Sequence, residues 1–242
     1  MNTLRFVVVI CLLSFGPVGC GAIDSFFMPA LQGSARDMLM AGNEAMQEKE
    51  YGKAIKYYKK LKESYPFSDY MELAEMGLAD AYFFDGKYTP AEEAYKEFES
   101  LHPGHKYIGY VLLQVGVSNL KQFKSIDLPM DHVAEAREYF QRVRELFPES
   151  TYAARAGQYL KKCNRIQAKH EIFVADFYQR RGKYLSAWKR YEFVKTHYSA
   201  FDDLQEYVSR QSRAAYLKYQ QSRSKQEHVQ RQGSWKQWFE WL

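Results

Sequence analysis

Small residues recur in this chain at intervals of twelve positions, and this spacing constrains the fold more than any other feature. An aromatic residue also stands four positions after the second small residue of each set. Self-similarity of this kind predicts an array of repeated structural units. The recurring small residues and prolines are Gly42, Ala54 and Pro66; Ala79, Ala91 and Pro103; Ala136 and Pro148, preceded by Gly116; and Ala175 and Ala187, with Ser199 in the place of proline. The aromatic residues are Tyr58, Tyr95, Phe140 and Tyr191.

The spacing fits pairs of packed helices. Small residues let two helix backbones approach closely, the aromatic ring fills the space beside that contact, and proline ends the second helix because it has no N–H to donate. The segments EYGKA, DGKY and RRGKY are predicted to supply glycine turns between the paired helices. The chain has only 14 Gly and 7 Pro among 242 residues, which favours helices over a loop-rich β fold. We therefore predict an all-α tetratricopeptide-repeat solenoid of stacked helix hairpins.

Two irregularities are predicted within the array. The segment QFKSIDLPMDHV, at 122–133, indicates a loop inserted between the two helices of the third unit. From Ser150 onward no helix breaker occurs until Gly182, which predicts one long connecting helix of about 45 Å, capped by Ser150 or Thr151. This helix would join the first three units to the fourth.

The first residues have the layout of a secretory signal: Arg5 is the sole charge, and an apolar run leads to small residues before Cys20. The run is shorter than the ~20 residues that a membrane-spanning helix needs. Pro17-Val18-Gly19-Cys20 resembles a bacterial lipobox, so Cys20 is predicted to be acylated and to anchor the chain. The alternative is an ordinary signal peptide with an incidental cysteine.

These features divide the chain into five predicted parts: a lipoprotein signal peptide over 1–19, an acylated linker over 20–33, N-terminal repeat units over 34–149, the long helix with C-terminal units over 150–232, and an aromatic tail over 233–242. The tail contains WKQWFEWL. It is predicted to fold back over the last helix or to bind a partner, with insertion at a membrane interface as the third possibility.

No combination of residues predicts catalysis, and we expect a protein that is not an enzyme and has no cofactor. His170-Glu171 begins like a zinc-protease motif, but Val174 stands where the second histidine is required. His102 and His105 lack a third ligand nearby, so no metal site is predicted. The net charge of +5 comes from basic residues interleaved with acids, which argues against nucleic acid as a partner. Cys163 is predicted to be a small buried hydrophobic residue.

The remaining candidates lie on the surface that the first helix of each pair would present. In this phase several polar and aromatic residues point into a concave groove or toward its edge, and an aromatic corner, SYPFSDY, follows the first unit. The alternative for Phe83, Phe84 and Leu120 is a place in the core between repeats. The groove candidates are Asn43, Asp80, Phe83, Phe84, Leu120, Asp176 and Arg180, and the corner contains Tyr65, Phe67 and Tyr70.

The order of these segments resembles the BamD (YfiO/ComL) family of outer-membrane assembly lipoproteins over about residues 20–200. The resemblance rests on the lipobox cysteine, the SYPFSDY corner, ADAYFFDGKYTPA, the inserted loop, LFPESTYAARA and AKHEIFVADFYQRRGKYLSAWKRYEFV. It implies a scaffold at the periplasmic face of the outer membrane. Such a scaffold binds unfolded β-barrel precursors and a BamA-like barrel protein, alongside other assembly lipoproteins.

The resemblance also implies roles for individual residues. Tyr65 and Phe67 belong to the side that receives the precursor, and Tyr70 lies in the same corner. Arg190, in WKRY, falls where the family has an arginine positioned for docking, and Arg180 is assigned with it. The other interpretation of Arg190 is a surface cation of a helix. Alternative functions are a pilotin-like repeat lipoprotein for a secretin or pilus, an accessory that recruits a peptidoglycan hydrolase, and a cytosolic regulator.

Overall fold

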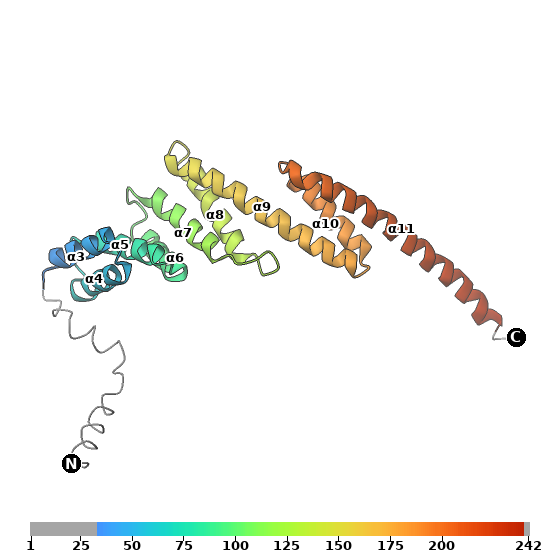
Figure 1. Cartoon of the computed structure of the whole chain (residues 1–242), viewed down its shortest axis with the longest axis horizontal. Helices are drawn as coiled ribbons and strands as arrows, with labels where there is room; N and C mark the ends of the chain where they lie inside the picture. The colour runs from blue at the N-terminus through green and yellow to red at the C-terminus, as the bar shows by residue number, and fades with distance from the viewer. Residues whose placement is uncertain (1–32, 240–242) are drawn as a thin grey trace, which may run out of the picture. The chain divides into compact units, whose positions relative to one another are not determined.

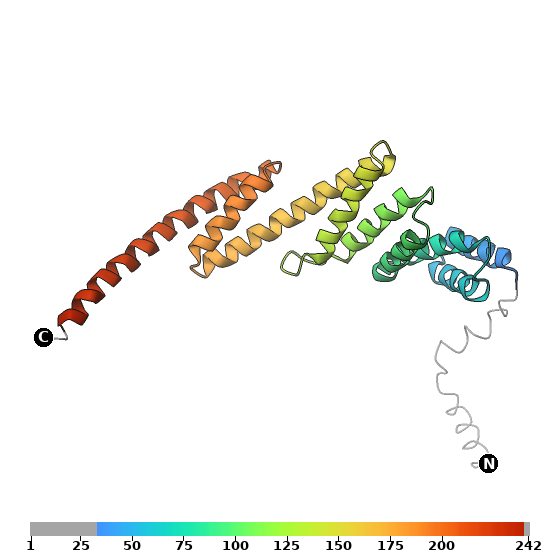
Figure 2. The same ribbon diagram turned by 180° about the vertical axis from the view of Figure 1, so that it is seen from behind.

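The computed structural model describes the backbone of residues 33–239 and the side chains of residues 33–231, and every regular element in that part is a helix (Figures 1 and 2). The chain divides into two compact units, Met1–Ala74 and Glu75–Leu242, with the boundary inside helix α5 (Met71–Phe84). The predicted signal peptide, Cys20 and most of the linker lie outside the described residues. Across the described helices, none combines the length and the apolar character that crossing a membrane requires.

The first unit contains a complete hairpin of α3 (Ala35–Gln47) and α4 (Tyr51–Ser64). Ser34 starts α3 with a capping box: its hydroxyl accepts the Asp37 N–H, and Asp37 accepts the Ser34 N–H at 2.9 Å. The two helices touch where the repeat spacing predicts. A Cβ on Gly42 would lie 2.5 Å from Cε1 of the buried Tyr58 ring, so only glycine fits there.

The turns between paired helices correct one prediction. Gly86 and Gly182 adopt positive φ angles of 74° and 72°, as the DGKY and RRGKY turns require. In the first unit, however, the residue with positive φ is Lys49, at 62°, and Gly52 lies in the first turn of α4. In each of these turns the residue with positive φ stands two positions before the tyrosine that begins the second helix. In the first unit this residue is Lys49, before Tyr51, so the glycine of EYGKA is not the turn glycine.

The second unit continues the hairpins. From α6 onward each helix packs against the next one along the chain, which confirms the all-α tetratricopeptide architecture of stacked hairpins. The helices of this unit after α5 are α6 (Tyr88–Leu101), α7 (Ile108–Gln122), α8 (Asp131–Leu146), α9 (Thr151–Arg180), α10 (Tyr184–His197) and α11 (Asp202–Phe239).

Helix α7 is the most deeply packed element of the second unit, with 12 of its 15 residues buried. A Cβ on Gly116 would lie 2.6 Å from Cε1 of Phe140 in α8, which repeats the contact of the first hairpin. The loop 123–130 follows α7 where an inserted loop was predicted. It is tied to the long helix, because Nδ1 of His170 lies 2.6 Å from the carbonyl oxygen of Ile126.

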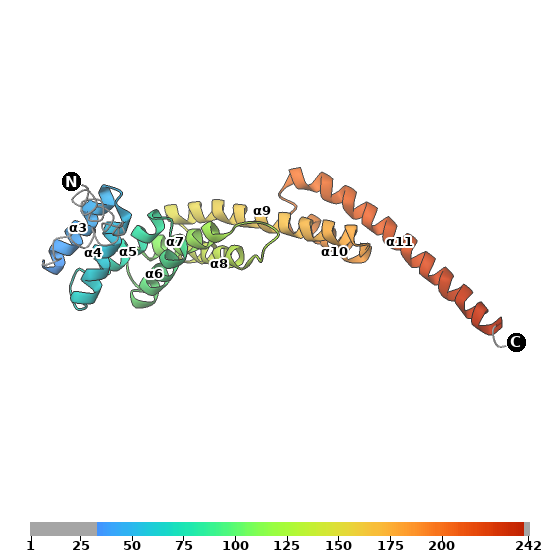
Figure 3. The ribbon, with the colours of Figure 1, turned by 60° about the horizontal axis from the view of Figure 1, so that its bottom comes forward.

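Helix α9 confirms the predicted long connecting helix. It runs for 30 residues from the N-cap Ser150, whose side chain accepts the Ala153 N–H. Its first half, through Cys163, belongs to a core shared with α5 to α8, and its second half, from Ala168 to Ala175, belongs to another core shared with α10 and α11. One helix therefore serves two hydrophobic cores, and Figure 3 shows it running from α7 and α8 to α10.

Helix α11 corrects the prediction for the C-terminus. It is continuous from Asp202 to Phe239, so the first part of the aromatic tail extends this helix and does not fold back over it. Among the described side chains of this helix, Val208 and Ala215 are buried in the second core, whereas residues 220–231 are all exposed. The helix continues past the end of α10 in every view (Figures 1 to 3).

Candidate functional site

Three of the polar groove candidates accept a hydrogen bond from the tyrosine of their own hairpin. The hydroxyl of Tyr58 donates to Asn43 Oδ1 at 2.7 Å, that of Tyr95 donates to Asp80 Oδ1 at 2.5 Å, and Asp176 accepts from Tyr191 in the same way. In each case the acceptor follows the small residue of the first helix. Each of these groups completes a helix contact; Asp80 and Asp176 are half-buried, whereas Asn43 remains exposed to solvent.

The third hairpin shows why the acceptor is needed. There the aromatic residue is Phe140, which has no hydroxyl, and the residue after Gly116 is the buried Val117. A buried polar group is costly without a partner, so an acceptor occurs where the ring carries an O–H and an apolar residue where it does not.

Asp80 is the most strongly perturbed of these acceptors. Burial raises its pKa above the ordinary value, although the hydrogen bonds from Tyr110 and Tyr95 act in the opposite direction. Tyr110 comes from α7, the next helix pair, and donates to the same oxygen at 2.6 Å. Asp80 thus joins three helices, which is a structural task.

The SYPFSDY corner presents the most exposed aromatic ring among the described residues of the first unit. Phe67 is 100% exposed, whereas Tyr65 is 37% exposed and donates its hydroxyl to the Gly33 carbonyl at 2.8 Å. The turn is closed by the Ser68 N–H, which donates to the Tyr65 carbonyl, and the half-buried Tyr70 follows it. Phe67 contributes nothing to the packing of its own unit and is available to a ligand.

The other apolar candidates divide between core and surface. Phe83 packs on the first core of the second unit and meets Tyr88 edge-on at 5.6 Å, while its neighbour Phe84 is 52% exposed. Leu120 is buried in that core, which is the alternative that the sequence left open. Of these three residues, Phe84 alone presents most of its side chain to solvent.

Arg190 lies in a charged and aromatic pocket between α9 and α10. Its guanidinium pairs with Glu171 at 2.5 Å and stacks over Tyr178, 5.7 Å from the ring centroid. The pocket is open to solvent and encloses about 450 Å³. Helix spacing brings Glu171 and Tyr178 to one side of α9, two turns apart. The full lining is Glu171, Tyr178, Ser186, Lys189, Arg190 and Phe193.

The sequence did not predict these neighbours of Arg190. Glu171 and Tyr178 stand seven positions apart, which places them on one side of a helix, and this was the available signal. Arg180, in contrast, lies nine positions after Glu171, or two and a half turns, on the opposite side of α9. The structure therefore does not bring Arg180 and Arg190 together on one surface.

Groups that could support other chemistry are structural. Among the described residues no three His, Cys, Asp or Glu side chains gather as metal ligands would. His102 contacts Glu75 through Nε2 at 2.7 Å and packs on Phe98. Cys163 is fully buried in the first core, as predicted, and burial raises the pKa of its thiol to about 11, which keeps it protonated at neutral pH.

Comparison with known proteins gives one matching family. The chain matches YfiO, described as an outer membrane lipoprotein, over residues 32–231. It is 28% identical over 180 residues to the outer membrane protein assembly factor BamD of Neisseria meningitidis, covering 70% of this chain and 67% of that protein. It is also 28% identical over 192 residues to the BamD protein of Xylella fastidiosa, covering 74% and 63%. The chain thus spans about two thirds of the length of these relatives.

Among solved structures, the TPR2AB domain of yeast Sti1 aligns with a TM-score of 0.48 and 15% identity, covering 76% of this chain and 70% of that one.

Proposed function

Because this chain belongs to the YfiO family of outer membrane lipoproteins, we propose that it is a non-catalytic scaffold of the machinery that assembles outer-membrane β-barrels. In this role it binds unfolded barrel precursors and docks the BamA-type barrel subunit, together with other assembly lipoproteins. The observation that carries the proposal is the match over residues 32–231, which spans both helical units. Acyl chains on Cys20 would hold the chain at the periplasmic face of the outer membrane.

The SYPFSDY corner supports precursor binding. An aromatic ring that is fully exposed on a rigid turn can be covered by an extended apolar segment without any rearrangement of the corner. Phe67 has this property, and Tyr65 holds the turn through its hydrogen bond to Gly33. One ring gives weak and reversible binding, which suits a protein that passes its ligand on.

The Arg190 pocket supports docking of a partner protein. A guanidinium has five N–H donors, and the pair with Glu171 engages only part of them. An incoming carboxylate can therefore join Arg190, while the exposed Lys189 adds a second positive charge and Phe193 an apolar wall. Charged groups around an aromatic floor are typical of the residues that dominate binding energy.

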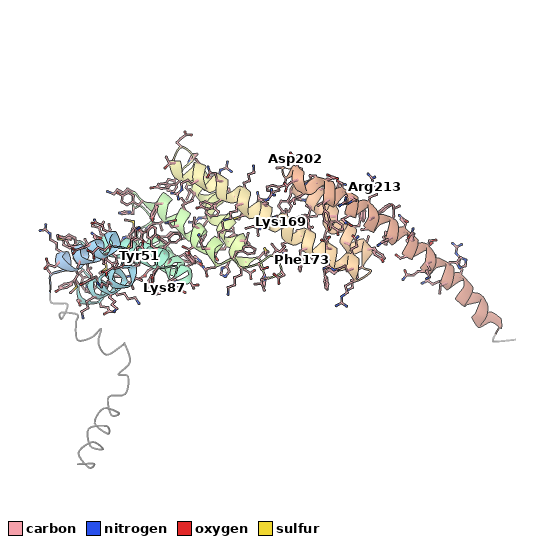
Figure 4. The ribbon with its side chains drawn as sticks, viewed as in Figure 1. Tyr51, Lys87, Lys169, Phe173, Asp202 and Arg213 are labelled. Atoms are coloured by element: carbon pink, nitrogen blue, oxygen red, sulfur yellow. The ribbon has the colours of Figure 1, made fainter. Side chains whose placement is uncertain are left out.

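The docking test is a mild-detergent pull-down of the tagged protein from its native envelope, with mass spectrometry of the partners. We expect recovery of a BamA-like barrel, and loss of it on Arg190→Glu. Because that change also places two carboxylates together, the swapped variant Glu171→Arg with Arg190→Glu restores an internal ion pair. The matched control is Arg213→Glu on α11, an exposed arginine that does not line the Arg190 pocket (Figure 4).

The outcomes separate docking from a purely structural role. If docking needs the cation of Arg190, the swapped variant stays folded and still loses the barrel protein. If the swap restores recovery, Arg190 only stabilises the α9–α10 contact. Recovery of a secretin or a peptidoglycan hydrolase without any barrel protein would overturn the assembly function and favour a pilotin-like or accessory role.

Precursor binding has its own test. Phe67→Ser is expected to leave the melting temperature unchanged, because the ring is fully exposed, and to weaken binding of a peptide with an aromatic C-terminal strand by roughly tenfold. Fluorescence anisotropy of the labelled peptide measures this. The control is Phe173→Ser, which removes another exposed ring, on α9 (Figure 4). Equal losses for both variants would show nonspecific adhesion.

A further inference from the structure

The exposed side of helix α11 carries the net charge of this protein. Between residues 210 and 231 the sequence has six basic residues and a single acid, Glu227, which gives a net charge of +5 with histidine counted as neutral. The whole chain also has a net charge of +5, so all its other residues together are neutral. Charge gathered in one segment of an otherwise balanced chain is typical of a surface that binds a partner of opposite charge. The basic residues are Arg210, Arg213, Lys218, Arg223, Lys225 and Arg231.

The helix places much of this charge on the side that faces away from its core. Val208, Ser212 and Ala215 are buried on one side of α11. At about 100° per residue, a second set of positions, three or four residues apart, follows the opposite side. We call this set the basic stripe, and all of its side chains are exposed: Arg210, Arg213, Leu217, Gln221, Ser224, His228 and Arg231.

The basic stripe has no acid of its own. Glu227 lies beside it and pairs with Arg223 at 3.0 Å, while Arg210 lies over the Tyr207 ring, 5.9 Å from the centroid. From Arg210 to its last residue the stripe extends about 32 Å, at 1.5 Å per residue. The stripe is therefore a long row of cations on one side of a helix.

We propose that the basic stripe binds the anionic surface of a lipid bilayer, with the helix lying along the headgroups. Clusters of about four to eight Lys and Arg on a helix are typical of segments that bind anionic lipids. A lipid surface contacts one side of a helix, which is how the stripe presents its cations. A protein partner fits less well, because the centre of a stable protein interface is depleted in charge, whereas the stripe has one large apolar side chain, Leu217, which is 55% exposed. The proposal does not rest on the assembly function.

The test uses the protein from Gly21 onward, which lacks the predicted acyl anchor and keeps every residue that the structure describes. It is mixed with phosphatidylcholine vesicles that contain or lack phosphatidylglycerol, and binding is measured by co-sedimentation. We expect binding to the anionic vesicles to exceed binding to the neutral ones at least about tenfold. This binding should be lost as the salt concentration rises from about 0.1 M to about 1 M, because salt screens the charges.

A charge reversal tests the stripe itself. Arg213→Glu with Arg231→Glu is expected to weaken binding to the anionic vesicles at least about tenfold (Figure 4 labels Arg213). Because both side chains are exposed, circular dichroism should show an unchanged helix content. The matched control is Lys56→Glu with Arg155→Glu, which makes the same change in net charge at exposed positions of α4 and α9. We expect the control to lose less than about twofold.

A conservative substitution separates a lipid surface from a protein partner. Arg213→Lys with Arg231→Lys keeps both charges but removes the planar fork with which arginine binds a carboxylate through two hydrogen bonds. Binding to the anionic vesicles is expected to stay within about twofold of the unmodified chain, since attraction to headgroups depends on charge. A tenfold loss, to about the level of the Glu variant, would contradict the proposal.

Four further outcomes would overturn it: no binding to the anionic vesicles, equal binding to the neutral ones, equal losses for the Glu variant and its control, or binding of poly-glutamate by a chain that does not bind the vesicles. The last result would assign the stripe to an acidic protein surface. The Glu variant should still recover the barrel protein in the pull-down, so a failure of the membrane contact is distinguished from a failure of the assembly function.

Discussion

Single residues set how closely the two helices of a hairpin approach. Gly116 and Gly42 each stand where a Cβ would overlap an aromatic ring, at 2.6 Å from Phe140 and 2.5 Å from Tyr58. A contact this short forces the ring or the backbone to move. The aromatic ring and the small residue are therefore one packing unit, and changing either one alone leaves an overlap or a cavity.

This argument predicts the effect of Gly116→Ala. We expect it to lower the free energy of unfolding by about 1–3 kcal/mol, as overpacking does, measured by urea denaturation. Phe140→Leu in the same chain should recover part of the loss. The control is Gly157→Ala in α9, where the nearest atom to the new Cβ is Arg144 Nε at 4.0 Å. That change should stabilise the protein by up to about 1 kcal/mol, and a loss there as large as that of Gly116→Ala would contradict the packing argument.

The raised pKa of Asp80 predicts a pH effect. The folded state binds the proton of this carboxyl more tightly than the unfolded state, whose pKa is 3.8. Stability is therefore lost as pH rises from about 3.8 through the folded-state pKa. Asp80→Asn cannot ionise and keeps the acceptor for both tyrosines, as Asn43 does for Tyr58.

We expect the variant to gain on the order of 1 kcal/mol over the unmodified chain as pH rises through this window. Urea denaturation between about pH 4 and 7 measures the difference. Asp176→Asn is the control: both oxygens of Asp176 accept from Tyr207 at 3.0 Å, so the amide loses an acceptor and destabilises at every pH. A gain for Asp80→Asn that does not change with pH would refute the role of ionisation.

At this scale the sequence predicted the small and aromatic partners but not the polar ones. The twelve-residue spacing identified Gly42, Tyr58 and Phe140 because packing needs size at fixed positions. Asn43 and Asp80 were assigned to a groove because periodicity gives the side of a helix and not the donor that arrives from another helix. The exposed Phe67 was found because a turn motif marked it, although its full exposure was not predictable.

At the scale of elements, strong breakers made the long helix and the loop predictable. Ser150 begins α9, Gly182 follows its end, and the loop 123–130 interrupts the third hairpin where its residues favour a loop. The length of α11 was not predictable, because Gln, Arg, Lys and Ser after residue 220 favour a helix without showing an apolar face. The pocket at Arg190 also needed the structure, since it depends on how α9 and α10 pack.

Because α9 serves two cores, breaking it between them should separate their unfolding. Lys169→Pro, at an exposed position of α9 (Figure 4), removes a backbone hydrogen bond and clashes with the preceding turn. We expect a loss of about 3 kcal/mol or more. Emission of Trp188, which packs on the second core, should then change at lower urea than helical circular dichroism. The emission is measured in a variant whose tail tryptophans, at positions 235, 238 and 241, are replaced, so that Trp188 is the one tryptophan left in the sequence. Lys169→Ala is the control, and coincident transitions in the proline variant would show that the cores remain coupled.

At the scale of the molecule, the second unit should show a gradient of local stability. Amide hydrogen exchange is slow where opening requires disruption of the whole core and fast where a helix packs on nothing. We therefore expect the slowest exchange in the second unit in α7, where 12 residues are buried, and the fastest exchange of any helix there in residues 220–239. Mass spectrometry of exchanged peptides measures this. Slow exchange in residues 220–239 would show that another part of the protein covers them.

The hydroxyl–acceptor pair of each hairpin also limits how such a chain can change over generations. Converting the pair Tyr95 and Asp80 into an apolar pair like Phe140 and Val117 takes at least two substitutions in different helices, because Tyr110 also donates to Asp80. Whichever occurs first leaves a buried polar group short of a partner. The path from one kind of hairpin to the other therefore passes through a less stable intermediate, and the two sites should be inherited together. A change at one of them becomes acceptable only in a chain that already has the change at the other.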